Sequence, residues 1–198
     1  WEPAAPILCA GVTVYKGLKV LDVRPGQWVA IVGVGGLGHL AVQYARAMGF
    51  HVAAVDIDSS RLQMARRLGA ELCVNAAEDD PVAVLQQELR GVHGALVTAV
   101  SRESFGQSLG MLHKRGTMSM VGLPPGDFAL PIFDVVLNAK TVRGSIVGTR
   151  QDLCEALQFA AEGVVHASTT SHPLERINHV FDELRNGRID GRAVLKFD

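Results

Sequence analysis

The chain has 198 residues, of which 48% are hydrophobic and 20% are charged, and its formal net charge is −1. This composition is typical of a soluble globular protein with one good core, or one domain plus part of another. The sequence contains no basic stretch and no apolar run of the ~18 residues that a membrane helix needs, so we expect no nucleic-acid partner and no membrane partner.

Three cysteines, Cys9, Cys73 and Cys154, are scattered along the chain. An odd and dispersed set argues against a disulfide framework and for a reducing compartment. The N-terminus lacks the basic and apolar regions of a signal peptide, so we expect a cytoplasmic protein. The first residue is Trp1 rather than methionine, which indicates either a fragment or a sequence whose beginning is missing.

From Gln27 onward, short apolar runs alternate with longer helical ones. Strands that alternate with crossover helices predict an α/β fold with a doubly wound parallel sheet covered on both faces. Strands are predicted at Trp28–Val32, His51–Val55, Leu72–Val74, Ala95–Ala99, Thr117–Val121 and Thr141–Ile146. Helices are predicted at Leu37–Met48, Ser60–Leu68, Pro81–Leu89, Glu103–Leu112 and Ile132–Leu137. The segment Ser60-Arg61-Leu62-Gln63 reads as a capping box.

After Gly148 the regular alternation of short apolar runs and helical segments ends. The pattern predicts helices at Gln151–Ala161 and Pro173–Leu184 and a strand at Arg192–Phe197. A single strand at the end of a chain needs a partner, and we expect that this one does not belong to the main sheet.

A glycine-rich turn follows the first predicted strand, in the order Val29-Ala30-Ile31-Val32-Gly33-Val34-Gly35-Gly36-Leu37-Gly38. Gly33 permits a tight turn, Gly35 lets the backbone approach a pyrophosphate, and Gly38 lets the helix pack closely on the sheet. Gly36 removes another side chain from the same surface, and the helix that opens at Leu37 offers free N–H groups to phosphates. An ordinary structural turn is the alternative, but a strand before it and an amphipathic helix after it favour a dinucleotide-binding Rossmann turn.

The second predicted strand is followed by an acidic residue, Asp56, which lies 18 residues after Gly38. This distance is close to the ~20 residues expected for the carboxylate that binds the adenosine ribose hydroxyls. A carboxylate would repel the 2′-phosphate of NADP, and the only nearby cation, Arg61, lies several residues further on. NAD is therefore the predicted cofactor, with a solvated turn residue as the alternative reading of Asp56. Asp58 is assigned to the turn before the next helix.

Five segments together resemble the zinc-dependent medium-chain alcohol dehydrogenases, most of all their bacterial ethanol-type branch. They are Pro6-Ile7-Leu8-Cys9-Ala10-Gly11-Val12-Thr13, Gly33–Gly38, Val55-Asp56-Ile57-Asp58, Val121-Gly122-Leu123-Pro124-Pro125-Gly126 and Gly144-Ser145-Ile146-Val147-Gly148. The resemblance implies an NAD-binding Rossmann domain at residues 12–147, with residues 1–11 and 148–198 belonging to the catalytic domain. It also implies dimers or tetramers that pair through the Rossmann domains. Residues 124–138, which include Phe128, Phe133 and several aliphatic residues, are a candidate contact surface.

The resemblance implies a role for each matching residue. Cys9 matches one protein ligand of the catalytic zinc, and Arg192 matches an arginine that reaches the pyrophosphate. The other implied cofactor contacts are Thr13, Gly33, Gly35, Gly36, Leu37, Gly38, Asp56, Arg61, Val121, Leu123, Ser145 and Val147. The remaining zinc ligands and the proton relay of the family belong to an N-terminal catalytic domain whose residues are absent here. Turnover by this chain alone is therefore not expected, since one thiolate cannot hold zinc.

The leading hypothesis is the NAD-binding portion of a zinc-dependent dehydrogenase that transfers hydride between an alcohol and NAD. A zinc-free medium-chain reductase, similar to quinone reductases, is a second enzyme hypothesis, against which Cys9 and Asp56 argue. A cofactor-binding module without turnover is the third. His39, directly after the glycine turn, reads as a partly exposed helix residue rather than a phosphate contact.

Overall fold

The computed structural model describes residues 2–197. Its main sheet has six parallel strands in the order β3-β2-β1-β4-β5-β6, which confirms the doubly wound α/β prediction. The strands are β1 (Trp28–Val32), β2 (His51–Asp56), β3 (Leu72–Asn75), β4 (Val92–Val97), β5 (Leu112–Met120) and β6 (Thr141–Gly144). The α-helices are α1 (Ala10–Lys19), α2 (Gly38–Ala47), α3 (Ser59–Arg67), α4 (Pro81–Leu89), α5 (Arg102–Met111), α6 (Ile132–Leu137), α7 (Arg150–Ala161) and α8 (Ile177–Arg185). Every helix within residues 2–197 is too short or too polar to cross a lipid bilayer.

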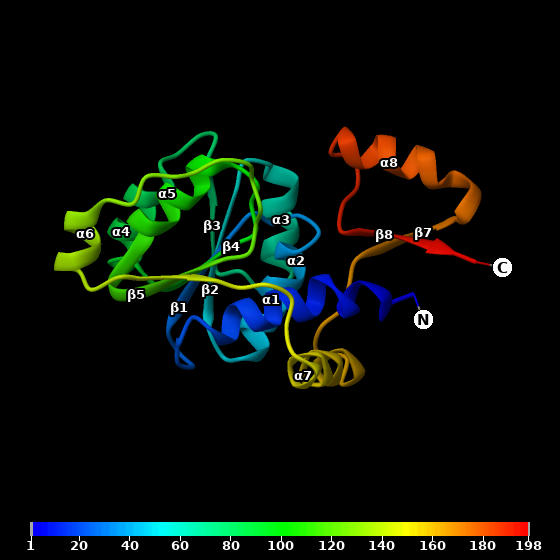
Figure 1. Cartoon of the computed structure of the whole chain (residues 1–198), viewed down its shortest axis with the longest axis horizontal. Helices are drawn as coiled ribbons and strands as arrows, with labels where there is room; N and C mark the ends of the chain where they lie inside the picture. Colours follow the sequence, from blue (N-terminus) through cyan, green and yellow to red (C-terminus); the bar gives the residue numbers. More distant parts are fainter. Residues whose placement is uncertain (1, 198) are drawn as a thin grey trace.

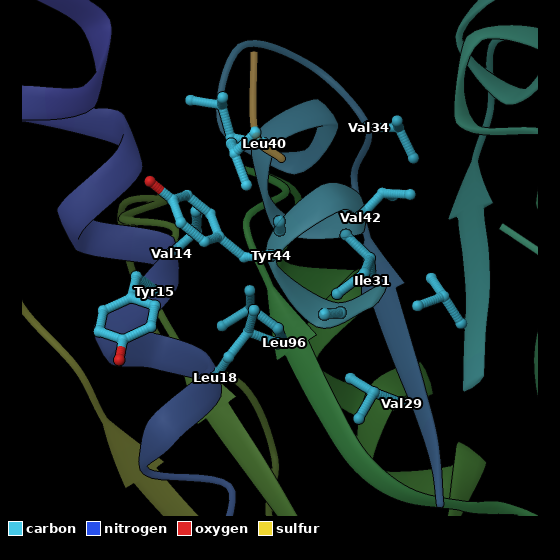
Figure 2. Close-up of a cluster of buried hydrophobic side chains, with 14 of the residues drawn as sticks. Val14, Tyr15, Leu18, Val29, Ile31, Val34, Leu40, Val42, Tyr44 and Leu96 are labelled. Carbon is cyan, nitrogen blue, oxygen red and sulfur yellow. The ribbon is translucent and has the colours of Figure 1, made fainter. Parts of the chain in front are cut away.

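Helices cover both faces of this sheet (Figure 1). Successive side chains of a strand point to opposite faces, and in β1 Val29 and Ile31 join a core with α1 and α2. Ala30 and Val32 join the opposite core, with α4 and α5. Figure 2 shows the first core, where Tyr44 of α2 packs between α1 and the sheet. Both faces are therefore apolar, as the parallel arrangement requires.

The first helix, α1, was not predicted, and it joins α7 to the sheet. A 3₁₀ helix (Ala5–Leu8) precedes it. The Tyr15 hydroxyl donates to Glu155 at 2.7 Å, and burial together with this bond raises the pKa of Tyr15 to about 12. Lys19 Nζ lies 2.8 Å from the buried carboxylate of Asp152. Burial opposes the ionisation of this carboxylate, but hydrogen bonds from Lys19 and Thr149 keep the pKa of Asp152 below its usual value.

The expected domain boundary between residues 11 and 12 falls inside α1. The division into domains stays a prediction.

The C-terminal part forms a second, two-stranded parallel sheet, set apart from the main sheet (Figure 1). It pairs β7 (Thr169–Pro173) with β8 (Arg192–Lys196), and a short 3₁₀ helix (Leu174–Arg176) leads into α8. The expectation that the last strand pairs outside the main sheet is confirmed. The helix predicted from Pro173 was wrong at its start, because Pro173 has extended backbone and is the last residue of β7.

The capping box predicted at Ser60 was also wrong. Asp58 has extended backbone and caps α3, because its carboxylate accepts a hydrogen bond from the Ser60 N–H at 2.8 Å. The Asp58 assignment to this turn is thereby confirmed. A true capping box opens α7, formed by Thr149 and Asp152.

Candidate functional site

The candidate site lies at the carboxyl ends of the strands, where the order of the sheet reverses between β1 and β4. A cavity of about 400 Å³ opens there. The sequence-predicted residues that line it are Gly33, Gly35, Gly36, Leu37, Asp56 and Arg61. Sequence analysis missed the segment after β4, Thr98–Ser101, which lines the same cavity. The rule that ligands bind at the switch point of a parallel sheet could have identified it, because β4 directly neighbours β1.

The four glycines of the turn have different structural requirements. Gly33 has φ +89°, and a Cβ there would lie 2.8 Å from the backbone nitrogen of Ala99. A Cβ on Gly38 would overlap the carbonyl oxygen of Gly33, and a Cβ on Gly36 would lie 2.8 Å from the Gly191 oxygen. A Cβ on Gly35 would meet no atom within 4 Å. The fold therefore does not require glycine at residue 35, whereas a ligand that approaches the backbone does.

Asp56 ends β2 and is only 7% exposed. Its Oδ2 accepts a hydrogen bond from the Val34 N–H of the glycine turn at 2.6 Å, and its Oδ1 accepts from the Asp58 N–H at 3.0 Å. Arg61 Nη1 lies 4.0 Å from Oδ1. A carboxylate offers about four acceptor positions, so Asp56 can order the turn and still accept hydrogen bonds from a ligand.

The start of α2 is open to an anion. The residue before the helix, Leu37, supplies no side-chain cap. The first turn of a helix carries its positive dipole end. Here the His39 N–H donates to the Gly35 carbonyl and the Leu40 N–H to the Leu37 carbonyl, both at 3.1 Å, so the attraction for an anion comes from the dipole and from the backbone of the turn. Together with the bare backbone of Gly35, this arrangement fits the pyrophosphate of a dinucleotide.

The residues expected near a nicotinamide follow β5 and β6. The Ser145 N–H donates to the Met120 carbonyl at 2.9 Å, which holds the two strand ends together. Leu123 and Ser145 line a second cavity of about 540 Å³. Val121 and Val147 do not line it, and Val147 has φ +44°, an uncommon conformation for a β-branched residue.

Cys9 and Thr13 lie at the start of α1 and line neither of these two cavities. The Cys9 side chain is exposed, and its carbonyl accepts the Thr13 hydroxyl at 2.6 Å. Within residues 2–197, no three His, Cys, Asp or Glu side chains come together as a metal would require. Since a catalytic zinc needs three protein ligands, these residues by themselves do not fit zinc.

The interpretation of His39 as partly exposed was wrong. Its side chain is fully buried and bonds to Gly35 of the turn and to Ser168 of the C-terminal part. The Arg192 guanidinium also lies against the turn, with Nη1 3.2 Å from the position of a Cβ on Gly36. The resemblance implied a contact of Arg192 with the pyrophosphate, but nothing in the sequence indicated that Gly191 packs against the turn or that Ser168 bonds to His39.

Comparison with known proteins gives consistent matches over the whole chain. A family model described as zinc-binding dehydrogenase matches residues 36–162. An alcohol dehydrogenase of Moraxella sp. (strain TAE123) is 60% identical over 193 residues, which make up 98% of this chain and 57% of that protein. The chain thus spans little more than half the length of this relative.

Solved structures agree with these matches. The alcohol dehydrogenase of the archaeon Aeropyrum pernix has a TM-score of 0.91 and 36% identity, and the match covers 98% of this chain and 57% of that one. Acetophenone reductase from Geotrichum candidum, solved in complex with NAD, has a TM-score of 0.85 and 26% identity, with 98% and 55% covered. Since the family model covers well over half of the chain, this chain belongs to the zinc-binding dehydrogenase family.

Proposed function

We propose that this chain is the NAD(H)-binding part of an alcohol dehydrogenase, which transfers hydride between a primary or secondary alcohol and NAD. The observation that carries the proposal is the cavity in which the Asp56 carboxylate and the open backbone of Gly35 face the same space. The names of the Moraxella and Aeropyrum relatives support the reaction class, and the NAD complex of the Geotrichum relative supports the cofactor.

The two cavities take different parts of the cofactor. The turn and the start of α2 bind the pyrophosphate through N–H groups, and Asp56 accepts hydrogen bonds from the adenosine ribose. We call residues 33–38, Asp56 and Arg61 the adenosine end. We call residues 121–123 and 145–147 the nicotinamide end, where Leu123 and Ser145 position the ring. When bound, the nicotinamide supplies the carbon that accepts or donates the hydride.

The negative charge of Asp56 supports NAD over NADP. An additional 2′-phosphate would lie next to a buried carboxylate already bonded to two backbone N–H groups. Arg61 lies beside Asp56 and Asp58, so its charge is shared with two carboxylates. Repulsion between like charges in a site of low exposure disfavours the phosphorylated cofactor.

A catalytic zinc belongs to the proposal only for a protein longer than this chain. Cys9 is the one residue that we assign to the metal, and its ligand partners would have to come from outside residues 2–197. This observation favours a second candidate function for the chain by itself, namely cofactor binding without turnover. A zinc-free reductase remains an alternative that metal analysis can exclude.

The experiment compares this chain with a longer protein that contains it. Zinc content is measured by atomic emission, and NADH absorbance is followed with alcohol and NAD. If only the longer protein contains zinc and oxidises the alcohol, the result supports the zinc enzyme for the longer protein and cofactor binding without turnover for this chain. Activity without zinc in the longer protein would exclude the zinc enzyme.

The proposal includes a homo-oligomer in the cytoplasm. Four apolar side chains of α6, Ile132, Phe133, Val136 and Leu137, are exposed, and α6 directly precedes the edge strand β6 in the sequence. An exposed apolar patch at a sheet edge is a common subunit contact. The three free cysteines are consistent with a reducing compartment. Light scattering of a Phe133→Asp variant tests the contact, because a charge there should shift the protein towards monomer.

A further inference from the structure

We propose that His39 is a positioning residue that fixes the pyrophosphate-binding turn and Arg192 relative to each other. The inference rests on the proposed function, because it concerns how the same site holds a pyrophosphate. His39 lies one residue after the last glycine of the turn, and its imidazole is fully buried.

The hydrogen bonds of His39 define one tautomer. The Ser168 backbone N–H can only donate, and it lies 3.2 Å from Nε2, so Nε2 carries no proton. Nδ1 therefore carries the proton of the neutral ring and donates it to the Gly35 carbonyl at 3.2 Å. A neutral imidazole with one donor and one acceptor thus joins two backbone segments that are far apart in the sequence.

The first arm of this connection orients the turn. The Gly35 carbonyl accepts both the His39 ring N–H and the His39 backbone N–H, the latter at 3.1 Å. In a planar trans peptide, the C=O of one residue and the N–H of the next point in opposite directions. Since the Gly35 oxygen is directed towards α2, the Gly36 N–H points away from α2. A ligand anion at the cavity can then accept from that N–H.

The second arm positions Arg192. Ser168, which donates to His39, accepts the Arg192 N–H at its carbonyl at 2.9 Å. The adjacent Gly191 oxygen lies 2.8 Å from the position of a Cβ on Gly36, so β8 begins in contact with the turn. The guanidinium of Arg192 consequently lies over Gly36, where it can add positive charge to the pyrophosphate site.

Gln43 provides a matched control. It lies one turn further along α2 and holds the same C-terminal segment, because its amide donates to the His166 carbonyl and accepts the His166 N–H, both at 2.9 Å. Its amide also donates to the His39 backbone carbonyl at 3.0 Å, and none of these bonds involves a residue of the turn, 33–38. Replacing Gln43 therefore loosens the segment without touching Gly35, whereas replacing His39 affects both.

The experiment measures the binding of ADP-ribose, ADP and adenosine to the intact chain by titration calorimetry and NMR. His39→Leu should lower the affinity for ADP-ribose and ADP about tenfold, equal to about 1.4 kcal/mol, and leave adenosine binding unchanged. His39→Gln, whose carbonyl can still accept from Ser168, should retain affinity within about threefold. In a chain that already carries Arg192→Ala, His39→Leu should lower the ADP-ribose affinity by a smaller factor than it does in the unmodified chain, as expected for two residues that act together.

Hydrogen exchange without ligand tests the connection itself. His39→Leu should speed exchange of the Ser168 and Arg192 amides, and His39→Gln should not. An equal loss of ADP-ribose affinity in Gln43→Leu and His39→Leu would overturn the inference, since general loosening would then suffice. If the unmodified chain binds no ADP-ribose, the proposed function is wrong; if it binds and His39→Leu binds equally well, only the role of His39 is wrong.

Discussion

At the adenosine end, Asp56 is 7% exposed and bonded to the backbone, whereas at the nicotinamide end Leu123 and Ile146 are 86% and 83% exposed. The first end is ordered by hydrogen bonds within the chain before any ligand arrives. The second presents apolar side chains to solvent, as expected for a surface that another molecule or segment covers. The comparison teaches that the affinity of this chain for a dinucleotide should come mainly from its adenosine half.

The largest expected effect concerns Gly38 at the adenosine end. In Gly38→Ala, the new methyl group overlaps the Gly33 carbonyl, so the turn and the start of α2 must separate. We expect the free energy of unfolding to fall by about 4 kcal/mol or more, as for other severe backbone clashes, and ADP-ribose binding to be lost. Thermal denaturation and calorimetry measure the two effects.

Gly35→Ala is the matched control for this prediction. A methyl group there meets no protein atom, so stability should stay the same or rise by about 0.4–1 kcal/mol. ADP-ribose affinity should nevertheless fall about tenfold, because the methyl group keeps the phosphates away from the backbone. A variant that binds ADP-ribose normally would show that Gly35 does not face the ligand.

Asp56 should give the next largest effect. In Asp56→Ala, the ribose loses a charged acceptor worth about 1.5–3 kcal/mol, so NAD affinity should fall about 10- to 100-fold. The difference between the affinities for NAD and NADP should become smaller, because the charge that repels the 2′-phosphate is gone. Asp56→Asn can keep the bond from Val34 without the charge, which separates the order of the turn from cofactor preference. An unchanged preference in both variants would contradict the assigned role.

A smaller effect is expected at the nicotinamide end. Leu123→Ser removes an exposed apolar side chain, so the melting temperature should not change. NAD affinity should fall about threefold, a loss of under ~1 kcal/mol of apolar contact, while ADP-ribose affinity stays the same. Equal losses for both ligands would mean that Leu123 does not contact the nicotinamide half.

The last effect concerns pH, and it changes the stability of the chain rather than ligand binding. Burial lowers the pKa of His39 from its ordinary value near 6.5, and the charge of Arg192 acts in the same direction. The folded chain therefore binds this proton less readily than the unfolded chain. Stability is full above about pH 6.5 and is lost as pH falls below it, by at most ~1.4 kcal/mol per pH unit. The melting temperature of His39→Gln should vary less than that of the parent between about pH 7.5 and about pH 5.5.

Much of the sheet could be predicted from the sequence, because its signals are local. The strand Trp28–Val32 and the helices Pro81–Leu89 and Ile132–Leu137 have the predicted bounds. The helix Ala10–Lys19 was missed because its sequence contains two glycines and three β-branched residues, which have low helix propensity. Cys9, the residue before it, also supplies no side-chain cap that would mark its start.

The candidate site divides in the same way. The glycines of the turn and Asp56 could be identified because they lie within one strand–helix–strand unit. The burial of His39 could not be predicted, because its partner Ser168 is 129 residues away in the sequence. His39 and Gln43 are two polar residues on α2, and the sequence around them gives no reason for them to be buried. Tertiary contacts, and not the local sequence, determine the burial of His39.

The packing of the Gly191 oxygen against Gly36 has a consequence for sequence drift among related chains. A side chain at residue 36 is excluded by the protein itself, so glycine should persist there even in a relative that no longer binds a nucleotide. Residue 35 has no such internal constraint and is free to change once the ligand is lost. Residue 35 is therefore the better diagnostic of whether a homologue still binds a dinucleotide.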